Sequence, residues 1–197
     1  MEAVTDHPSS PSAERDRPSK PDDGIWRKVF ADLAEGRHSA LDKLYDLAAR
    51  HLYGLALWRT GSEDDAADVV QTVFVKVAEQ ASKLASIRNP RGWLLTVTHR
   101  AAVDIARRRR RRPTEPLEEY PFLTAVDGDS DRMLDAAHAS ILLAGMPPTL
   151  RDVIYLKHFA DCTFAEIGAI VGIPTFTAAS RYRKGISDLR RLMEDEP

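Results

Sequence analysis

The chain has 197 residues and a mass of 22.0 kDa, enough for one large domain or two small ones. Its formal net charge of -2 excludes a uniformly basic protein that coats nucleic acid. A composition of 43% hydrophobic and 29% charged residues is typical of a soluble globular protein. The single cysteine, Cys162, excludes an internal disulfide and a multi-cysteine zinc site, and it fits a reducing cytosol. The six histidines lack ligand spacing, so we expect no metal and no other cofactor.

Residues 1–24 form a polar segment with four prolines and no apolar signal-peptide core, and we expect a disordered tail there. No stretch of the chain approaches the roughly 20 consecutive apolar residues of a membrane span. The sequence therefore predicts a cytoplasmic protein without membrane insertion.

Four helices are predicted between Ile25 and Arg112, and together they would form one bundle. The first covers 25–35, the second follows a cap at Ser39, the third covers 63–84 after a cap at Ser62, and the fourth runs from 93 to 112 after a loop over 85–92. Apolar residues recur at helical spacing in each. In the second these are Leu41, Leu44, Leu47 or Ala48, Leu52 and Leu55; in the fourth they are Leu94, Val97, Ala101 and Ile105.

Six consecutive arginines, 107–112, close the fourth predicted helix, and an acidic linker follows at once. The linker, 113–135, holds seven acids against one arginine, a net of -6. A dense run of like charge repels itself and needs either water or a polyanion. A near-neutral chain thus contains a basic patch that suits phosphate, although a merely solvated run is the alternative.

A second helical block occupies 136–195. Thr163 and Glu166 form the T-x-x-E capping box of a short helix, and Gly172-Ile173-Pro174 separates it from a basic helix. This order is typical of a helix-turn-helix, in which Ile167, Val171, Ile173, Ala178 and Tyr182 would pack between the two helices. An ordinary helical hairpin is the alternative.

The two blocks resemble the extracytoplasmic-function (group IV) sigma factors of bacterial RNA polymerase. The stretch "DDAADVVQTVFVKV" is similar to the family's D-A-E-D-x-x-Q-x-x-F segment, and "PRGWLLTVTHRAAVDIARRRRRR" is similar to its promoter-reading helix. The stretch from Leu142 to Leu192 is similar to sigma region four. The resemblance implies an all-α fold of two small domains: sigma region two over 25–112, the flexible acidic linker, and a helix-turn-helix region four over 136–195.

The resemblance also implies a function. Such proteins bind core RNA polymerase, direct it to double-stranded promoter DNA, help to melt it, catalyse nothing themselves, and are held by an anti-sigma factor. By position, the polymerase-binding residues would be Asp65, Asp68, Gln71 and Phe74. The residues at the -10 element would be Asn89, Arg91, Trp93, Arg100, Arg107, Arg108 and Arg111. Those at the -35 element would be Thr175, Phe176, Thr177, Ser180, Arg181, Arg183 and Lys184.

Several positions depart from the family pattern. Ala67 replaces a glutamate, His99 an arginine and Arg100 an asparagine, while Phe176 and Ala179 replace glycine and lysine. The departures at Arg100 and Ala179 leave a polymerase-binding regulator without promoter recognition as a rival hypothesis. A stand-alone helix-turn-helix regulator is a second rival, independent of these departures. The chain has no Gly-rich phosphate loop and no nucleophile–base pattern, so we do not expect an enzyme.

Overall fold

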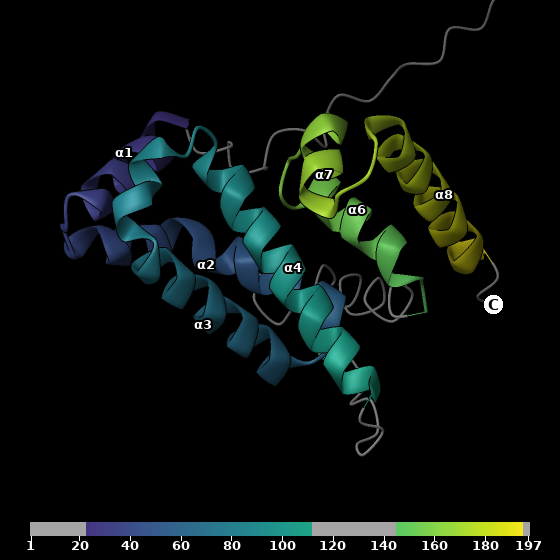
Figure 1. Cartoon of the computed structure of the whole chain (residues 1–197). Helices are drawn as coiled ribbons and strands as arrows, with labels where there is room; N and C mark the ends of the chain where they lie inside the picture. The colour runs from purple at the N-terminus through teal and green to yellow at the C-terminus, as the bar shows by residue number, and fades with distance from the viewer. Residues whose placement is uncertain (1–22, 112–144, 195–197) are drawn as a thin grey trace, which may run out of the picture.

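The computed structural model describes residues 23–111 and 145–194, and every regular element in these two ranges is a helix (Figure 1). The predicted all-α class is therefore confirmed. The elements are α1 (Asp23–Ala34), α2 (Ser39–Thr60), α3 (Glu63–Glu79), the 3-10 helix η1 (Ala81–Ser86), α4 (Pro90–Arg111), α6 (Pro148–His158), α7 (Phe164–Val171) and α8 (Thr175–Glu194).

Three expected boundaries lie partly or wholly outside the described residues. Most of the predicted tail does so, but Asp23 and Gly24 already belong to α1, so that the tail was drawn two residues too long. The acidic linker and the start of the second helical block, 136–144, also fall outside the described ranges.

The first domain is built from α1 to α4 around a leucine- and valine-rich core. The Ser62 hydroxyl accepts a hydrogen bond from the Asp65 backbone N–H at 3.3 Å, as the predicted cap requires. Gly61 adopts the left-handed conformation (φ 70°) that ends α2, which a residue with a Cβ rarely adopts. Trp26 and Trp58 are buried, and the largest side chains that are fully buried are Phe30, Leu44, Leu52, Leu55, Val69, Val73, Val77, Leu84, Leu94 and Leu95.

Three details of this domain differ from the sequence-based expectation. The third helix ends at Glu79 and not at Leu84, because the tighter η1 turn carries Leu84 into the core beside α1. Ser39 is not the cap of α2, since His38 before it is already helical (φ -60°, ψ -31°). Leu41 is exposed, although it lies in the helical apolar pattern.

The second domain contains the predicted helix-turn-helix. Both hydrogen bonds of the Thr163–Glu166 capping box are present, and Gly172 ends α7 with a φ of 78°. Ile167 and Ala178 are buried between α7 and α8, and Val171, Ile173 and Tyr182 pack on the same core. A Cβ at Gly168 would lie 2.7 Å from the backbone oxygen of Ile173, so the turn requires glycine there.

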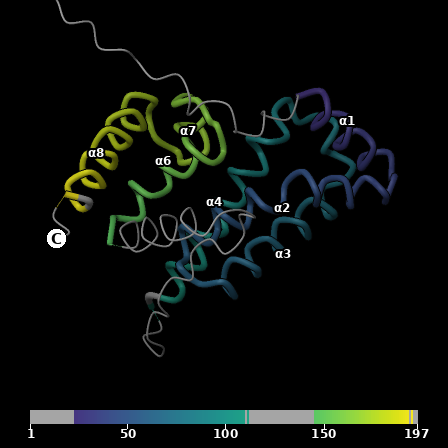
Figure 2. Tube along the Cα trace, turned by 180° about the vertical axis from the view of Figure 1, so that it is seen from behind, coloured from purple at the N-terminus to yellow at the C-terminus, as the bar shows by residue number. Residues whose placement is uncertain are grey.

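The two domains pack against each other, which the sequence pattern did not indicate. Helix α6 lies against α2, and α7 lies against α4 (Figure 2). The buried side chains of both domains form one continuous core. The rings of Trp58, Tyr155 and Phe159 meet at this junction, with centroids 5.2–5.3 Å apart.

Candidate nucleic-acid and polymerase interfaces

The start of α3 presents the residues that the resemblance implied for polymerase binding. Asp68 and Gln71 are exposed, while the Phe74 ring is half-buried against the Tyr45 ring, with centroids 5.5 Å apart. Asp65 is already engaged, because Arg109 Nη1 donates to its Oδ2 at 3.0 Å. Of the four residues, two thus stand open to a partner, and one ties α3 to the arginine run.

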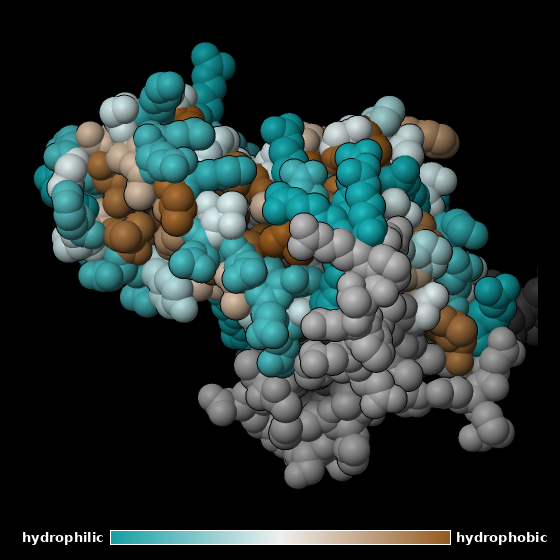
Figure 3. All heavy atoms as spheres, turned by 60° about the horizontal axis from the view of Figure 1, so that its bottom comes forward, coloured by the Kyte–Doolittle hydropathy of each residue, from teal (hydrophilic) through white to brown (hydrophobic). Residues whose placement is uncertain are grey.

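Exposed apolar side chains lie beside the exposed residues of α3, and they were not predicted from the sequence. Tyr45 and Val75 lie on α2 and α3 and are about half exposed, and Leu41 stands at the start of α2. Figure 3 shows apolar side chains gathered at the end of the first domain that is farthest from α8. The helical pattern wrongly assigned Leu41 to the core, whereas Val75 lies outside the apolar stripe of its helix, which includes Val73 and Val77.

The start of α4 holds two of the residues predicted to read the -10 element. Asn89 is exposed, and its Oδ1 accepts from the Gly92 backbone N–H at 2.8 Å, which caps the helix. Trp93 is half-buried and meets Phe30 edge to face, with centroids 5.9 Å apart. Trp93 therefore packs on the core and keeps part of its ring at the surface.

An open groove of about 520 Å³ lies beside this point, between α1 and η1. Two arginines, Arg27 and Arg88, line it together with Phe30, Ser86 and Ile87. Ligand pockets typically have volumes of about 300–1,000 Å³, so the groove is large enough for a planar group. Its two guanidinium groups favour an anionic neighbour.

Arg91 does not face solvent, although the resemblance implied a role on DNA. The side chain is only 8% exposed, and its guanidinium donates a hydrogen bond to the backbone oxygen of Ala160, in the loop that joins α6 to α7. A contact between Arg91 and DNA therefore requires the two domains to separate, and its DNA-binding role stays a prediction.

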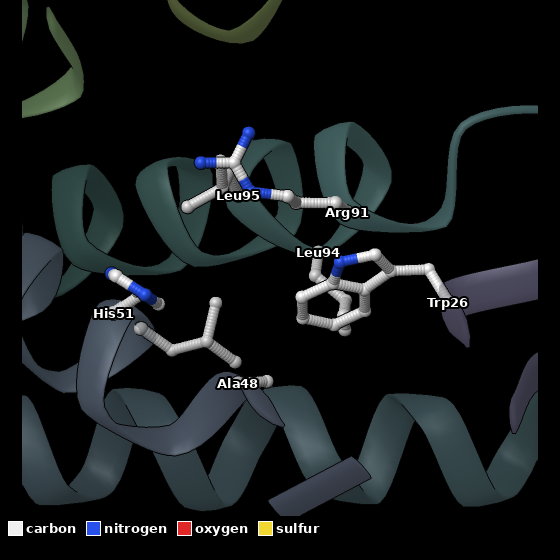
Figure 4. Close-up of a pocket in the computed structure, with 7 residues that line it drawn as sticks. Trp26, Ala48, His51, Arg91, Leu94 and Leu95 are labelled. Atoms are coloured by element: carbon white, nitrogen blue, oxygen red, sulfur yellow. The ribbon is translucent and has the colours of Figure 1, made fainter. Parts of the chain in front are cut away.

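A cavity of about 10 Å³ lies under Arg91 and is lined by Trp26, His51, Leu94 and Leu95 as well (Figure 4). It has room for one water molecule and excludes a base. Burial lowers the pKa of His51, and the neighbouring charges of Arg91 and Arg50 lower it further, so the imidazole is neutral at pH 7.

The arginine side chains at the end of α4 lie in two different environments. Arg107, Arg108 and Arg111 are exposed, as is Arg100 two turns before Arg107, whereas Arg109 is half-buried in its ion pair with Asp65. The last arginine of the run, 112, lies outside the described residues. The end of α4 projects beyond the bundle in Figure 1, which leaves its arginines accessible to a phosphate backbone.

Helix α8 presents a face that combines basic, hydroxyl and aromatic side chains. Phe176, Ser180, Arg183 and Lys184 are exposed at helical spacing, and Thr175 is exposed beside them, while Thr177 and Arg181 are half-buried. Lys184 lies 3.7 Å from Asp188, an exposed pair that adds little stability. Phe176 is 77% exposed, more than the next most exposed large apolar side chain in the described part of the chain, Tyr45 at 57%.

A charged cluster between the domains was missed entirely. Asp152 of α6 lies between Arg59 of α2 and His99 of α4, with its Oδ2 2.8 Å from Arg59 Nη1 and 3.0 Å from His99 Nε2. The partners are 93 and 53 residues apart along the chain, so no local pattern could have joined them. The one indication of this cluster in the sequence was that His99 stands where the sigma-factor family usually has an arginine.

Two further properties concern the described residues alone. None of the helices within 23–111 and 145–194 combines the length and apolarity needed to cross a membrane. The same ranges contain no group of three or more His, Cys, Asp or Glu side chains able to hold a metal ion.

Comparison with known proteins identifies both domains. The family model of Sigma-70 region 2 matches residues 44–112, and that of Sigma-70, region 4 matches residues 142–191. The chain is 29% identical to the ECF RNA polymerase sigma factor SigE of Mycolicibacterium smegmatis, over 80% of this chain and 64% of that protein. It is 27% identical to the ECF RNA polymerase sigma factor SigK of Mycobacterium ulcerans, over 90% of this chain and 97% of SigK. It is 24% identical to the ECF RNA polymerase sigma factor SigW of Bacillus subtilis, over 86% of this chain and 97% of SigW.

Solved structures share the fold. CnrH in complex with the cytosolic domain of CnrY superposes with a TM-score of 0.67 at 21% identity, over 88% of this chain and 99% of that one. The sigma factor RpoE of Bartonella quintana, in complex with the anti-sigma factor NepR, superposes with a TM-score of 0.67 at 20% identity. The match covers 79% of this chain and 98% of RpoE.

Proposed function

We propose that different helices of this chain, which belongs to the ECF RNA polymerase sigma factors and carries sigma-70 regions 2 and 4, bind the polymerase and the two promoter elements. Sigma factors are non-enzymatic: they bind RNA polymerase and promoter DNA and direct promoter-specific initiation of transcription. In our proposal α3 binds core polymerase, α4 with the groove beside it engages the -10 element, and α8 reads the -35 element. The observation that carries this proposal is the exposure of basic side chains on two helices, α4 and α8, in two different domains. The two matched regions give no support to a stand-alone helix-turn-helix regulator.

The polymerase contact is assigned to Asp68 and Gln71. Both are exposed on α3, and the neighbouring Tyr45 and Val75 supply apolar area of the kind that interfaces bury. The Asp68→Ala/Gln71→Ala variant is expected to bind core polymerase at least tenfold more weakly. It loses a hydrogen bond to the charged Asp68, which contributes about 1.5–3 kcal/mol, and one to the neutral Gln71, which contributes about 0.5–1.5 kcal/mol. Competition against the wild-type chain for core polymerase measures this. Asp23→Ala, an exposed acid at the start of α1, is the control, and equal losses in both variants would contradict the assignment.

The -10 contact is assigned to the groove between α1 and η1 and to the exposed arginines of α4. Trp93 is half-buried and packs against Phe30, which also lines the groove. An unstacked base against an aromatic ring gains about 1–3 kcal/mol. Arg100, Arg107, Arg108 and Arg111 then hold the backbone and set the register without reading sequence.

The -35 contact is assigned to α8, with Phe176 against the methyl group of a thymine. Residues at the start of a recognition helix face base edges, and phenylalanine can recognise a base there only through an apolar contact. Replacing that thymine by deoxyuridine removes the methyl alone. We expect about a fourfold loss of holoenzyme affinity, since one buried methylene-sized group contributes about 0.8 kcal/mol.

The deoxyuridine substitution is made at each thymine of the mapped -35 element in turn and measured by promoter binding. The Phe176→Ala variant should be insensitive to every one of these substitutions, and deoxyuridine outside the element serves as the DNA control. If the wild-type chain tolerates deoxyuridine at every position, Phe176 does not contact a thymine methyl.

Two broader parts of the proposal follow from the family. The similar structures of CnrH and of RpoE are complexes with CnrY and with the anti-sigma factor NepR, and we infer that an anti-sigma factor also binds this chain. Core polymerase is a cytoplasmic partner, so the chain would act in the cytoplasm.

A further inference from the structure

One ion pair joins the surface assigned to polymerase to the helix assigned to the -10 element. Arg109 Nη1 of α4 lies 3.0 Å from Oδ2 of Asp65 in α3, although the two residues are 44 positions apart along the chain. Both side chains are partly withdrawn from solvent, at 30% and 23% exposure. Asp65 lies one helical turn before the exposed Asp68, and Arg109 belongs to the arginine run.

Arg109 points away from the arginines assigned to DNA. Two positions along an α-helix rotate a side chain by about 200° around the axis, so Arg109 lies on the face of α4 opposite to the exposed Arg107 and Arg111. Its guanidinium is half-buried against α3 and donates to the Asp65 carboxylate. Arg109 is therefore placed to hold α4 on the bundle and not to bind the phosphates that its neighbours face.

The start of α3 fixes the position of the Asp65 carboxylate. The Asp65 backbone N–H donates to the hydroxyl of Ser62 at 3.3 Å, and Ser62 is only 5% exposed. The first turn of a helix also favours a negative charge, because the positive end of the helix dipole lies there. A line of contacts thus runs from the buried Ser62 through Asp65 and Arg109 to the arginine run.

The end of α4 has reason to need such an attachment. It projects beyond the bundle (Figure 1), the last carbonyl groups of a helix have no partner within it, and consecutive arginines repel one another. A frayed helix end has to be ordered again when it meets DNA, and this ordering weakens binding. The ion pair to α3 opposes the fraying, and its contribution is modest because both side chains are partly exposed.

We propose that Asp65 is a positioning residue for the arginine run: through Arg109 it holds the end of α4, so that the exposed arginines meet the promoter backbone already ordered. Asp65 then contributes to promoter binding and not to the contact with core polymerase, although its place in the family motif implied that contact. The promoter part of this inference rests on the proposed function, whereas the attachment of α4 to α3 does not.

The first experiment measures amide hydrogen exchange in the free full-length chain by NMR. Asp65→Ala should accelerate exchange of the backbone amides in the last described turn of α4 about two- to fivefold, which is the factor that a partly exposed ion pair contributes. Asp64→Ala is the matched control, because it removes the same charge from an exposed side chain in the same turn of α3, and it should leave this exchange unchanged. Unchanged exchange in Asp65→Ala, or equal acceleration in both variants, would overturn the attachment.

The second experiment uses holoenzyme reconstituted from core polymerase and the full-length chain. Asp65→Ala should bind core polymerase as tightly as wild type in the competition assay, yet bind a promoter about two- to fivefold more weakly. Removing a negative charge that merely lay near the DNA would have the opposite effect and raise promoter affinity. With Arg109→Ala already in place, Asp65→Ala should cause no further loss, because the two residues act through one contact.

Three results of the second experiment would contradict the proposed role. Weaker binding of Asp65→Ala to core polymerase would make Asp65 a polymerase contact. Promoter affinity that is unchanged or higher would mean that the ion pair does not assist DNA binding, and a further loss in the Arg109→Ala background would mean that Asp65 acts through another contact. If the wild-type holoenzyme binds no promoter, the proposed function fails and the promoter part fails with it, while hydrogen exchange still decides whether Asp65 holds α4.

Discussion

Replacing Arg107, Arg108 and Arg111 by alanine is expected to weaken promoter binding by the holoenzyme to a similar degree on every promoter and to flatten its salt dependence. All three side chains are exposed at the projecting end of α4, where they can neutralise phosphates. Each phosphate contact contributes about 0.9 to the slope of log affinity against log salt, so three contacts contribute about 2.7. The expected change is a slope shallower by about 2–3, with the choice of promoter unaltered.

The measurement is promoter affinity over a salt series for the wild-type and triple-alanine holoenzymes. A triple variant at the other end of the first domain, with Lys28, Arg37 and Lys43 changed to alanine, removes the same charge and should leave the slope unchanged. Equal slopes for wild type and the α4 variant would mean that the arginine run is merely solvated.

Gly168→Val is expected to abolish recognition of the -35 element by distorting the helix-turn-helix. A Cβ at this position would lie 2.7 Å from the Ile173 oxygen and 3.4 Å from the Thr175 backbone nitrogen, and neither backbone atom can move without shifting α8. Overpacking of this kind costs about 1–3 kcal/mol. Transcription from promoters that depend on the -35 element should fall at least tenfold, while binding to core polymerase through α3 persists.

Ala169→Val is the matched control for this variant. Ala169 is the next residue of α7 and is exposed, so the added methyl groups meet solvent and only helix propensity changes, by less than about 1 kcal/mol. Thermal unfolding and transcription are measured for both variants. If Gly168→Val transcribes as well as Ala169→Val, the turn does not require glycine.

Local features of both domains could be predicted from sequence because their causes are local. The Thr163–Glu166 capping box, the Gly172 end of α7 and the Ser62 cap depend on residues within one helical turn, and all three are present. The break after Glu79 was missed because Leu84 fits the helical repeat equally well. Only its burial beside α1 shows that the chain changes to a 3-10 turn.

The docking of the two domains could not be predicted in the same way. Its contacts join Arg59 to Asp152 and His51 to Tyr155, which are 93 and 104 residues apart along the chain. An aromatic residue such as Tyr155 would also suit the core of either domain. A similar limit applies to the arginine run. The repeated residue type hides the fact that Arg109 faces Asp65 while its neighbours face solvent.

Reconstitution with core RNA polymerase on sheared genomic DNA, followed by sequencing of the run-off transcripts, tests most directly whether this chain directs promoter-specific initiation. We expect a defined set of start sites, absent with core polymerase alone, that share two upstream elements spaced for α4 and α8. Binding to core polymerase without any defined start site would contradict a sigma-factor function, and a polymerase-binding regulator would then fit the chain better.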